Sequence, residues 1–249
     1  MGFFRSLLSR KGVSASTCHD PLLIVVSGKI YSWDGRRVEL RGGSGVVHCL
    51  VQYRGAIFGG ELGGIANYAS GLDLNSPLTV RERDSTTALC VHDGTLFDAS
   101  RKDNNHWEIR NTMTDELVSE RTHPVLALAS HAGTLYDGGG YGVHETKTSR
   151  KASDLVCDAM CSHNDRLYIA SVTTIRDLNT GEPVGRAQGD EVTALCSFEG
   201  QLIHADLGLG IWETLSQRLI VSYDTIDKVR RRKSKTMAAV CIVQAHGLT

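Results

Sequence analysis

The chain contains little proline and no long apolar stretch. Only 4 of its 249 residues are proline, and aromatic residues make up 6%. The aliphatic run from Leu22 to Val26 has the length of a strand, and no apolar run approaches the roughly 18 residues that cross a bilayer. The sequence therefore excludes a protein that spans a membrane with helices.

The cysteines lack the spacing of a metal or disulfide framework. There are 7 of them, an odd number, and no pair is separated by the two residues of a C-x-x-C motif. Cys90, Cys161 and Cys196 instead occupy one place in a repeated pattern, where a free thiol serves as a small buried apolar group. We therefore expect no structural metal site and a reducing, intracellular location, the cytoplasm.

The composition is otherwise that of a folded globular domain. Hydrophobic residues make up 41% and charged residues 22%, with 27 Lys and Arg against 28 Asp and Glu. Nine of the basic residues lie within 1–11 and 228–235, so the rest of the chain is acidic. The 26 glycines exceed the usual share of roughly 7%, which favours a fold with many tight turns.

One pattern recurs along the chain: an apolar strand, a polar turn and a second strand with an apolar start. The copies are Thr87–Phe97, Leu126–Tyr136, Asp158–Tyr168 and Thr193–Ile203, with a weaker copy at His48–Phe58. Their turns lie 32 to 39 residues apart, a period that fits a four-stranded propeller blade. Dipeptides such as Asp93-Gly94 and Glu199-Gly200 supply the positive φ that two-residue hairpins need.

The two ends of the chain complete this count. Residues 237–247 match a first strand and its turn, and residues 22–40 supply three further strands. The sequence thus predicts a single all-β domain over 21–249, a six-bladed β-propeller of four-stranded antiparallel blades. Its last blade would join the C-terminal strand to the three N-terminal strands, which removes an open sheet edge. A competing alignment gives seven irregular units.

Two segments resemble the WD-repeat β-propellers. Residues 30–34 end a strand with Trp33-Asp34, and residues 175–181 resemble the family's Ile-x-x-Trp-Asp-x-x-Thr-Gly without its Trp. The resemblance implies binding rather than catalysis. It also implies a contact surface on the face that carries the second-to-third turns and the fourth-to-first connections.

Equivalent positions of the second strands form a candidate ring around the axis. The ring comprises Asp98, Asp137 and His204, with Glu61 and Asp206 near the same loops. Such groups could line a funnel that binds a cation, an amine or a sugar. The alternative, which we favour, is that these short polar side chains hydrogen-bond turn amides and hold the glycine-rich corners in place.

Two basic segments lie outside the repeats. A run of six cations falls in the connection to the last strand, predicted as a loop over 228–235, and could contact phosphates or be a solvated linker. It contains Lys228, Arg230, Arg231, Arg232, Lys233 and Lys235. The arm of residues 1–20 has Phe3, Phe4, Leu7 and Leu8 on one helical face, which leaves membrane-surface contact through residues 1–11 as a minor alternative.

Catalytic motifs are missing from the sequence. No Gly-x-Ser-x-Gly elbow occurs, and the run Gly138 to Gly142 leads into a strand pattern rather than the helix of a phosphate loop. His92, His131 and His163 stand at matching turns, which splay outward and do not form a metal ring. We therefore expect no catalytic residue, cofactor or metal.

The function that the sequence favours is a monomeric scaffold whose loops bind a protein or peptide. The first alternative is a small-ligand or enzymatic site in the central funnel. The second is phosphate or nucleic-acid contact through 228–235. We favour it less, because a run of charged residues without aromatic side chains has little ability to recognise a nucleotide sequence.

Overall fold

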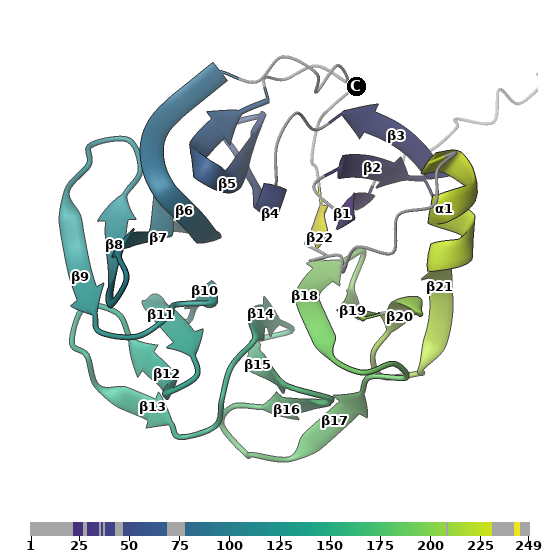
Figure 1. Ribbon diagram of the computed structural model, residues 1–249. Coiled ribbons are helices and arrows are strands. Elements are labelled where there is room, and N and C mark those ends of the chain that lie inside the picture. Colours follow the sequence, from purple (N-terminus) through teal and green to yellow (C-terminus); the bar gives the residue numbers. More distant parts are fainter. Residues whose placement is uncertain are drawn as a thin grey trace, which may run out of the picture.

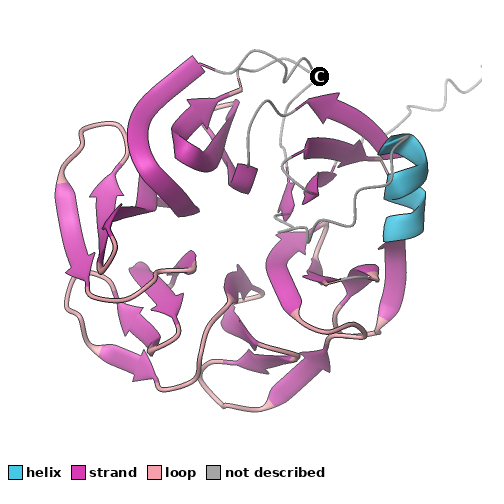
Figure 2. Cartoon of the chain, viewed as in Figure 1, coloured by secondary structure: helices cyan, strands magenta, loops and turns pink. Residues whose placement is uncertain are grey.

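The strands of the chain form a ring of antiparallel sheets around a central axis (Figure 1). The computed structural model describes residues 22–26, 29–34, 36, 38–42, 47–68, 78–207, 209–230 and 242–244. Within these residues, strands dominate and one helix is present, which Figure 2 shows in cyan. The protein is therefore an all-β propeller, as the repeat predicts.

Three sheets are simple four-stranded meanders in which each strand pairs with the next along the chain. Sheet C contains β10 (Ala127–His131), β11 (Thr134–Gly139), β12 (Gly142–Glu145) and β13 (Lys151–Ser153). Sheet D contains β14 (Ala159–His163), β15 (Arg166–Ser171), β16 (Thr174–Asp177) and β17 (Pro183–Arg186). Sheet E contains β18 (Val192–Phe198), β19 (Gln201–Asp206), β20 (Gly210–Glu213) and β21 (Arg218–Ser222).

Sheet A joins the two ends of the chain. Its order is β22 (Ile242–Gln244), β1 (Leu22–Val26), β2 (Lys29–Trp33) and β3 (Val38–Gly42). In the antiparallel pair of β1 and β22, Leu22 lies opposite Gln244 and Ile24 lies opposite Ile242. The predicted pairing of a C-terminal strand with three N-terminal strands is confirmed, and it closes the ring.

Sheet B has six strands, and here the prediction of six separate four-stranded blades is wrong, as is the alternative of seven units. The strands are β4 (Val47–Tyr53), β5 (Ala56–Asn67), β6 (Leu78–His92), β7 (Thr95–Asp103), β8 (His106–Asn111) and β9 (Leu117–Arg121). The ring therefore consists of sheets B to E and the small sheet A.

The cause is the unbroken course of β5 and β6, which have 12 and 15 residues. β5 pairs with β4 through its first half and with β6 through its second half. Ser85 of β6 lies opposite both Leu62 of β5 and Arg101 of β7, and a bulge follows between Thr86 and Ala88. A bulge lets a strand bend without ending, so the two parts remain one sheet.

The core lies between neighbouring sheets all the way around the ring. Ala99, Ile109 and Leu128 belong to one buried cluster between sheets B and C, and further clusters link C with D, D with E, E with A and A with B. The buried innermost strands are rich in small residues such as Ala127 and Ala129, because flanking sheets crowd them on both sides. Each sheet thus depends on its neighbours for burial.

The helix α1 (Tyr223–Arg230) follows the last strand of sheet E. Ile226 is fully buried in the cluster that sheets E and A share. The helix includes the first three residues of the segment 228–235, which was predicted to be a loop throughout.

Candidate binding face

One face of the ring carries both the turns between second and third strands and the connections that lead into each innermost strand. This follows from the meander, because antiparallel strands alternate in direction. We call it the connection face. We assign to it the bends of the long strands β5 and β6 at 61–63 and 84–85, together with residues 103–106, 122–126, 140–141, 154–158, 172–173, 187–191, 207 and 209.

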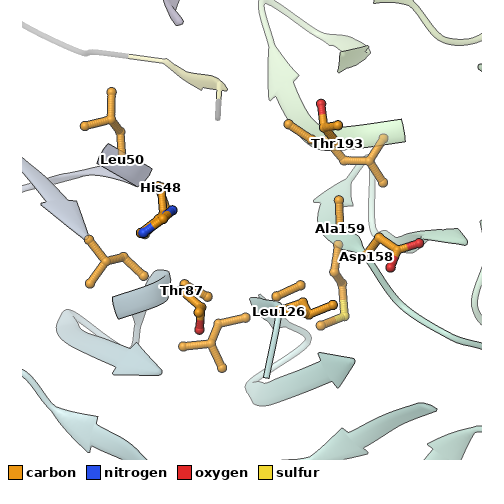
Figure 3. Close-up of a pocket in the computed structure, with 15 residues that line it drawn as sticks. His48, Leu50, Thr87, Leu126, Asp158, Ala159 and Thr193 are labelled. Atoms are coloured by element: carbon orange, nitrogen blue, oxygen red, sulfur yellow. The ribbon is translucent and has the colours of Figure 1, made fainter. Parts of the chain in front are cut away.

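A cavity of about 170 Å³ lies at the centre of the ring (Figure 3). It is lined by three consecutive residues from each of five innermost strands or their leading connections. The outer tier, at the connection face, contains His48, Thr87, Leu126, Asp158 and Thr193. The middle tier contains Cys49, Ala88, Ala127, Ala159 and Ala194. The inner tier contains Leu50, Leu89, Leu128, Met160 and Leu195.

Backbone bulges position three of the outer-tier residues. The register of the first two strands shifts between Val47 and Cys49, and equivalent shifts enclose Thr87 and Thr193. A bulge turns its extra residue away from the regular alternation, which commonly re-aims side chains near binding sites.

Most polar groups of this tier bind the protein itself. The Thr87 hydroxyl lies 2.6 Å from the Val125 carbonyl oxygen, to which it donates, and the Asp158 carboxylate accepts from the Val172 amide at 2.8 Å. His48 differs, because its buried Nε2 atom has no hydrogen-bond partner among the described residues. Burial lowers the pKa of His48, and the opposing charge of Glu61 only partly offsets this. The neutral imidazole therefore prevails at neutral pH.

The predicted ring residues lie one strand farther from the axis. Asp98, Asp137 and His204 pair directly with Leu89, Leu128 and Leu195 of the inner tier. Their shared register was correctly inferred, but they are buried and do not line the central cavity. Neighbouring strands lie about 4.8 Å apart, which is enough to put an innermost strand between these residues and the axis.

Asp137 is held by a buried ion pair. Arg121 of β9 donates from Nε to Oδ1 at 2.9 Å and from Nη2 to Oδ2 at 2.7 Å, which connects sheet B to sheet C. Both side chains are almost fully buried. Such bidentate pairs are strong and directional.

Asp98 has a different set of partners. It accepts hydrogen bonds from Ser100 at 2.8 Å and Thr112 at 2.9 Å, and Nε of Arg83 lies 3.6 Å from its Oδ2. Burial raises the pKa of Asp98, whereas these hydrogen bonds and the charge of Arg83 act against the rise.

His204 and Asp206 bind groups within and beside sheet E. The Nδ1 atom of His204 lies 3.1 Å from the Thr214 hydroxyl, and burial lowers the pKa of His204 to about 4. Asp206 accepts from the amides of Gln188, Gly189 and Gly210. Asp206 thus holds a turn and a connection of the connection face, which is the structural role that the sequence favoured for these residues.

The remaining predicted residues are dispersed. Glu61 accepts a hydrogen bond from the Tyr68 hydroxyl in sheet B. Lys228 and Arg230 belong to α1, whereas Arg231, Arg232, Lys233 and Lys235 lie outside the described residues, as does the arm 1–20.

The three matching histidines join consecutive sheets rather than a metal. Nδ1 of His92, His131 and His163 lies 2.9 to 3.0 Å from the hydroxyls of Ser130, Ser162 and Ser197, respectively. Each serine belongs to the innermost strand of the next sheet. Within the described part of the chain, no cluster of three or more His, Cys, Asp or Glu could hold a metal ion.

Large apolar side chains are exposed on the connection face over sheets C and D. We call Leu126, Tyr141, Leu155, Val156 and Val172 the apolar arc; each is exposed, Tyr141 by 65% and Val172 by 55%. Of the other exposed large apolar residues, Leu62 and Leu209 lie on the same face. Toward the opposite face, Met113 and Leu215 are exposed in turns, and Leu117 and Leu219 are exposed near the starts of β9 and β21.

The glycine run of β11 brings the parts of this arc together. The Leu126 amide donates to the Gly138 carbonyl at 2.8 Å, and the Cys157 amide donates to the Gly139 carbonyl at 3.0 Å. A Cβ atom on Gly139 would lie 2.1 Å from the Pro124 carbonyl oxygen. These glycines therefore permit close backbone approach, which explains a motif that only superficially suggests a phosphate loop.

The charge of the connection face has one sign. Its described residues contain seven carboxylates and neither Lys nor Arg; the carboxylates belong to Glu61, Asp84, Asp103, Asp154, Asp158, Asp190 and Glu191. Among the cations just outside it, Lys151 pairs with Asp154 at 2.5 Å, Lys102 pairs with Glu108 at 2.8 Å, and Arg186 is exposed at the end of β17.

The sequence analysis missed both His48 and the apolar arc. The available signal was the first position of the repeated pattern, where half-buried His48, exposed Leu126 and Asp158 stand in place of the threonine found at Thr87 and Thr193.

Comparisons with known proteins give a likeness in fold. No protein-family model matches the chain, and no curated protein matches it. The extracellular domain assigned to a one component system of B. thetaiotaomicron is 13% identical, with a TM-score of 0.55, over 77% of this chain and 30% of that one. A chain of the mitotic checkpoint complex is 14% identical, with a TM-score of 0.49, over 88% and 86%. The U3-55K structure is 14% identical, with a TM-score of 0.46, over 76% and 75%.

The described residues form no helix that is both long and apolar enough to traverse a bilayer.

Proposed function

We propose that this protein is a non-catalytic interaction scaffold that binds a segment of another protein on its connection face. The observation that carries the proposal is the apolar arc, because exposed apolar side chains gathered on one face mark interaction sites. A ring of sheets packed on one another offers a rigid base for such loops.

Three further features belong to this proposal. The chain is a divergent WD-repeat-like propeller, it acts as a monomer, and it resides in the cytoplasm. Five described cysteines are free thiols, and burial raises the pKa of Cys90 to about 12, which suits an unreactive role in a reducing compartment.

A peptide selection tests the main proposal. A displayed library of random peptides is selected on the wild-type protein and then screened on the variant Tyr141→Ser/Val156→Ser. The matched control, Met113→Ser/Leu215→Ser, removes exposed apolar groups from the opposite face. We expect selected peptides to lose binding to the first variant and to keep it on the control. Peptides that respond only to the control, or no enrichment at all, would refute the proposal.

The central cavity supports a second candidate, a site for a small polar ligand. The supporting observation is the unpartnered Nε2 of His48 at the cavity wall. A thermal-shift panel of small metabolites on wild-type and His48→Gln protein tests it, because a bound ligand raises the melting temperature. Equal shifts in both proteins would eliminate His48 as a ligand contact.

A further inference from the structure

The apolar arc and the charge around it specify the chemistry of the partner. We infer that the connection face binds a basic amphipathic segment, in which large apolar side chains alternate with Lys or Arg. This inference rests on the proposed function and adds the sign of the partner's charge.

The arc is continuous across two sheets. Leu126 and Val156 flank the turn that carries Tyr141, since their connections are hydrogen-bonded to Gly138 and Gly139. Val172 continues the arc, because its amide donates to the carboxylate of Asp158, which ends the connection that carries Val156. One elongated partner segment can therefore contact apolar side chains over sheets C and D.

A group of three tilted rings lies at the centre of the arc. The Tyr141 and His123 rings have centroids 4.8 Å apart, and His123 lies 5.9 Å from His144. Burial lowers the pKa of His123, and the neighbouring His144 and Arg121 lower it further, against the opposing effect of Asp137. The base of the arc is thus uncharged at neutral pH and adds no repulsion toward a cationic partner.

Some carboxylates of the connection face remain available to a partner. Asp84 and Asp190 are exposed, Glu191 is half-buried, and within the described residues none of the three forms an ion pair. Two other carboxylates are engaged, since Asp154 pairs with Lys151 and Asp103 with His106. Because the described residues of the face include neither Lys nor Arg, they would repel an acidic segment and attract a basic one.

Cationic side chains of the partner would form solvent-exposed ion pairs with the carboxylates of this face. Each such pair contributes little and is screened by salt, so charge selects the partner while the apolar groups anchor it. The proposal therefore predicts salt-sensitive selectivity on top of a salt-resistant apolar contact.

A charge-varied peptide library tests the inference. Each displayed peptide has Leu or Phe at helical and alternating spacings, and every other position holds Lys, Glu or Gln in equal shares. Selection uses the full chain at low salt. We expect Lys to be enriched over Glu by about two- to fivefold per contacting position, with the excess shrinking in high salt.

Two double variants assign the effect to this face. Asp190→Asn/Glu191→Gln should reduce the Lys excess, whereas the control Glu116→Gln/Glu182→Gln removes two exposed carboxylates from the opposite face and should leave it unchanged. If the selected peptides show no excess of Lys but still lose binding to Tyr141→Ser, the inference is wrong and the proposed function stands. A pool that is insensitive to Tyr141→Ser overturns the proposed function itself.

Discussion

Nδ1 of His163 in sheet D lies 2.9 Å from the hydroxyl of Ser197 in sheet E, and the same contact joins His92 to Ser130 and His131 to Ser162. Three successive boundaries between sheets are thus linked by one imidazole–hydroxyl hydrogen bond each. Since apolar packing is non-directional, these bonds supply the register between neighbouring sheets.

Removing the serine hydroxyls should loosen these boundaries. We expect Ser162→Ala and Ser197→Ala each to lower the free energy of unfolding by about 1 kcal/mol, because they leave the half-buried His131 and the buried His163, respectively, without a hydrogen-bond partner. Urea denaturation measures the change. The exposed Ser216→Ala serves as control and should stay within about 0.5 kcal/mol of wild type. Equal stability of all three variants would show that the bonds do not hold the sheets.

Acid should destabilise the fold through its buried histidines. Burial lowers the pKa of His204 from 6.5 to about 4, and it also lowers that of His163. The unfolded chain therefore binds the proton more tightly, so stability is complete above about pH 6.5 and falls as the pH drops toward about 4.

The variant His204→Gln isolates the contribution of one imidazole. Between about pH 7.5 and about pH 5, His204 alone should cost the wild type about 2 kcal/mol of unfolding free energy. Urea denaturation at both pH values should show a smaller loss in the variant. A loss of the same size in both proteins would assign the acid sensitivity to other groups.

The local hairpins and the closure of the ring could be predicted because short sequence signals determine them. Asp93 and Glu199 have φ of 48° and 47°, and each precedes a glycine with positive φ, as a two-residue hairpin requires. The pairing of the C-terminal strand with the N-terminal strands could likewise be predicted, because both segments are apolar and match the strands of the repeat. The number of separate sheets could not be predicted in this way, because it depends on whether hydrogen bonding continues through the bend at Ser85.

The candidate site was only partly predictable for a related reason. Alignment put Asp98, Asp137 and His204 at one register, and the structure agrees. Register fixes the height of a residue along the axis but not the distance of its strand from that axis. The exposure of Tyr141 depends on how far its turn projects, which hydropathy does not record.

The pair of Arg121 and Asp137 offers a test of the structural role of the ring residues. Asp137→Asn should destabilise the protein by roughly 3–5 kcal/mol, because it leaves the buried Arg121 guanidinium uncompensated. The double variant Arg121→Met/Asp137→Leu should recover much of that loss, since it removes both charges. Thermal and urea denaturation measure both. A single variant as stable as wild type would instead favour a ligand-binding role for Asp137.

Gly139 and Gly140 are neighbours in sequence with different surroundings, and they provide a matched pair for the apolar arc. A Cβ atom on Gly139 would lie 2.1 Å from the Pro124 carbonyl oxygen, whereas one on Gly140 would have no atom within 4 Å. Gly139→Ala must therefore displace the connection that carries Leu126. We expect the free energy of unfolding to fall by about 2 kcal/mol or more. The added methyl group would clash with a backbone atom, which cannot move aside as the end of a flexible side chain can.

Gly140→Ala should change stability by no more than about 0.5 kcal/mol. The same pair also probes binding, because displacement of the connection alters the spacing between Leu126 and Tyr141. Peptides selected on the wild type should bind Gly140→Ala normally and Gly139→Ala weakly, when both are measured by fluorescence polarisation well below their melting temperatures. Full binding by a destabilised Gly139→Ala would show that the partner contacts the arc without requiring its present spacing.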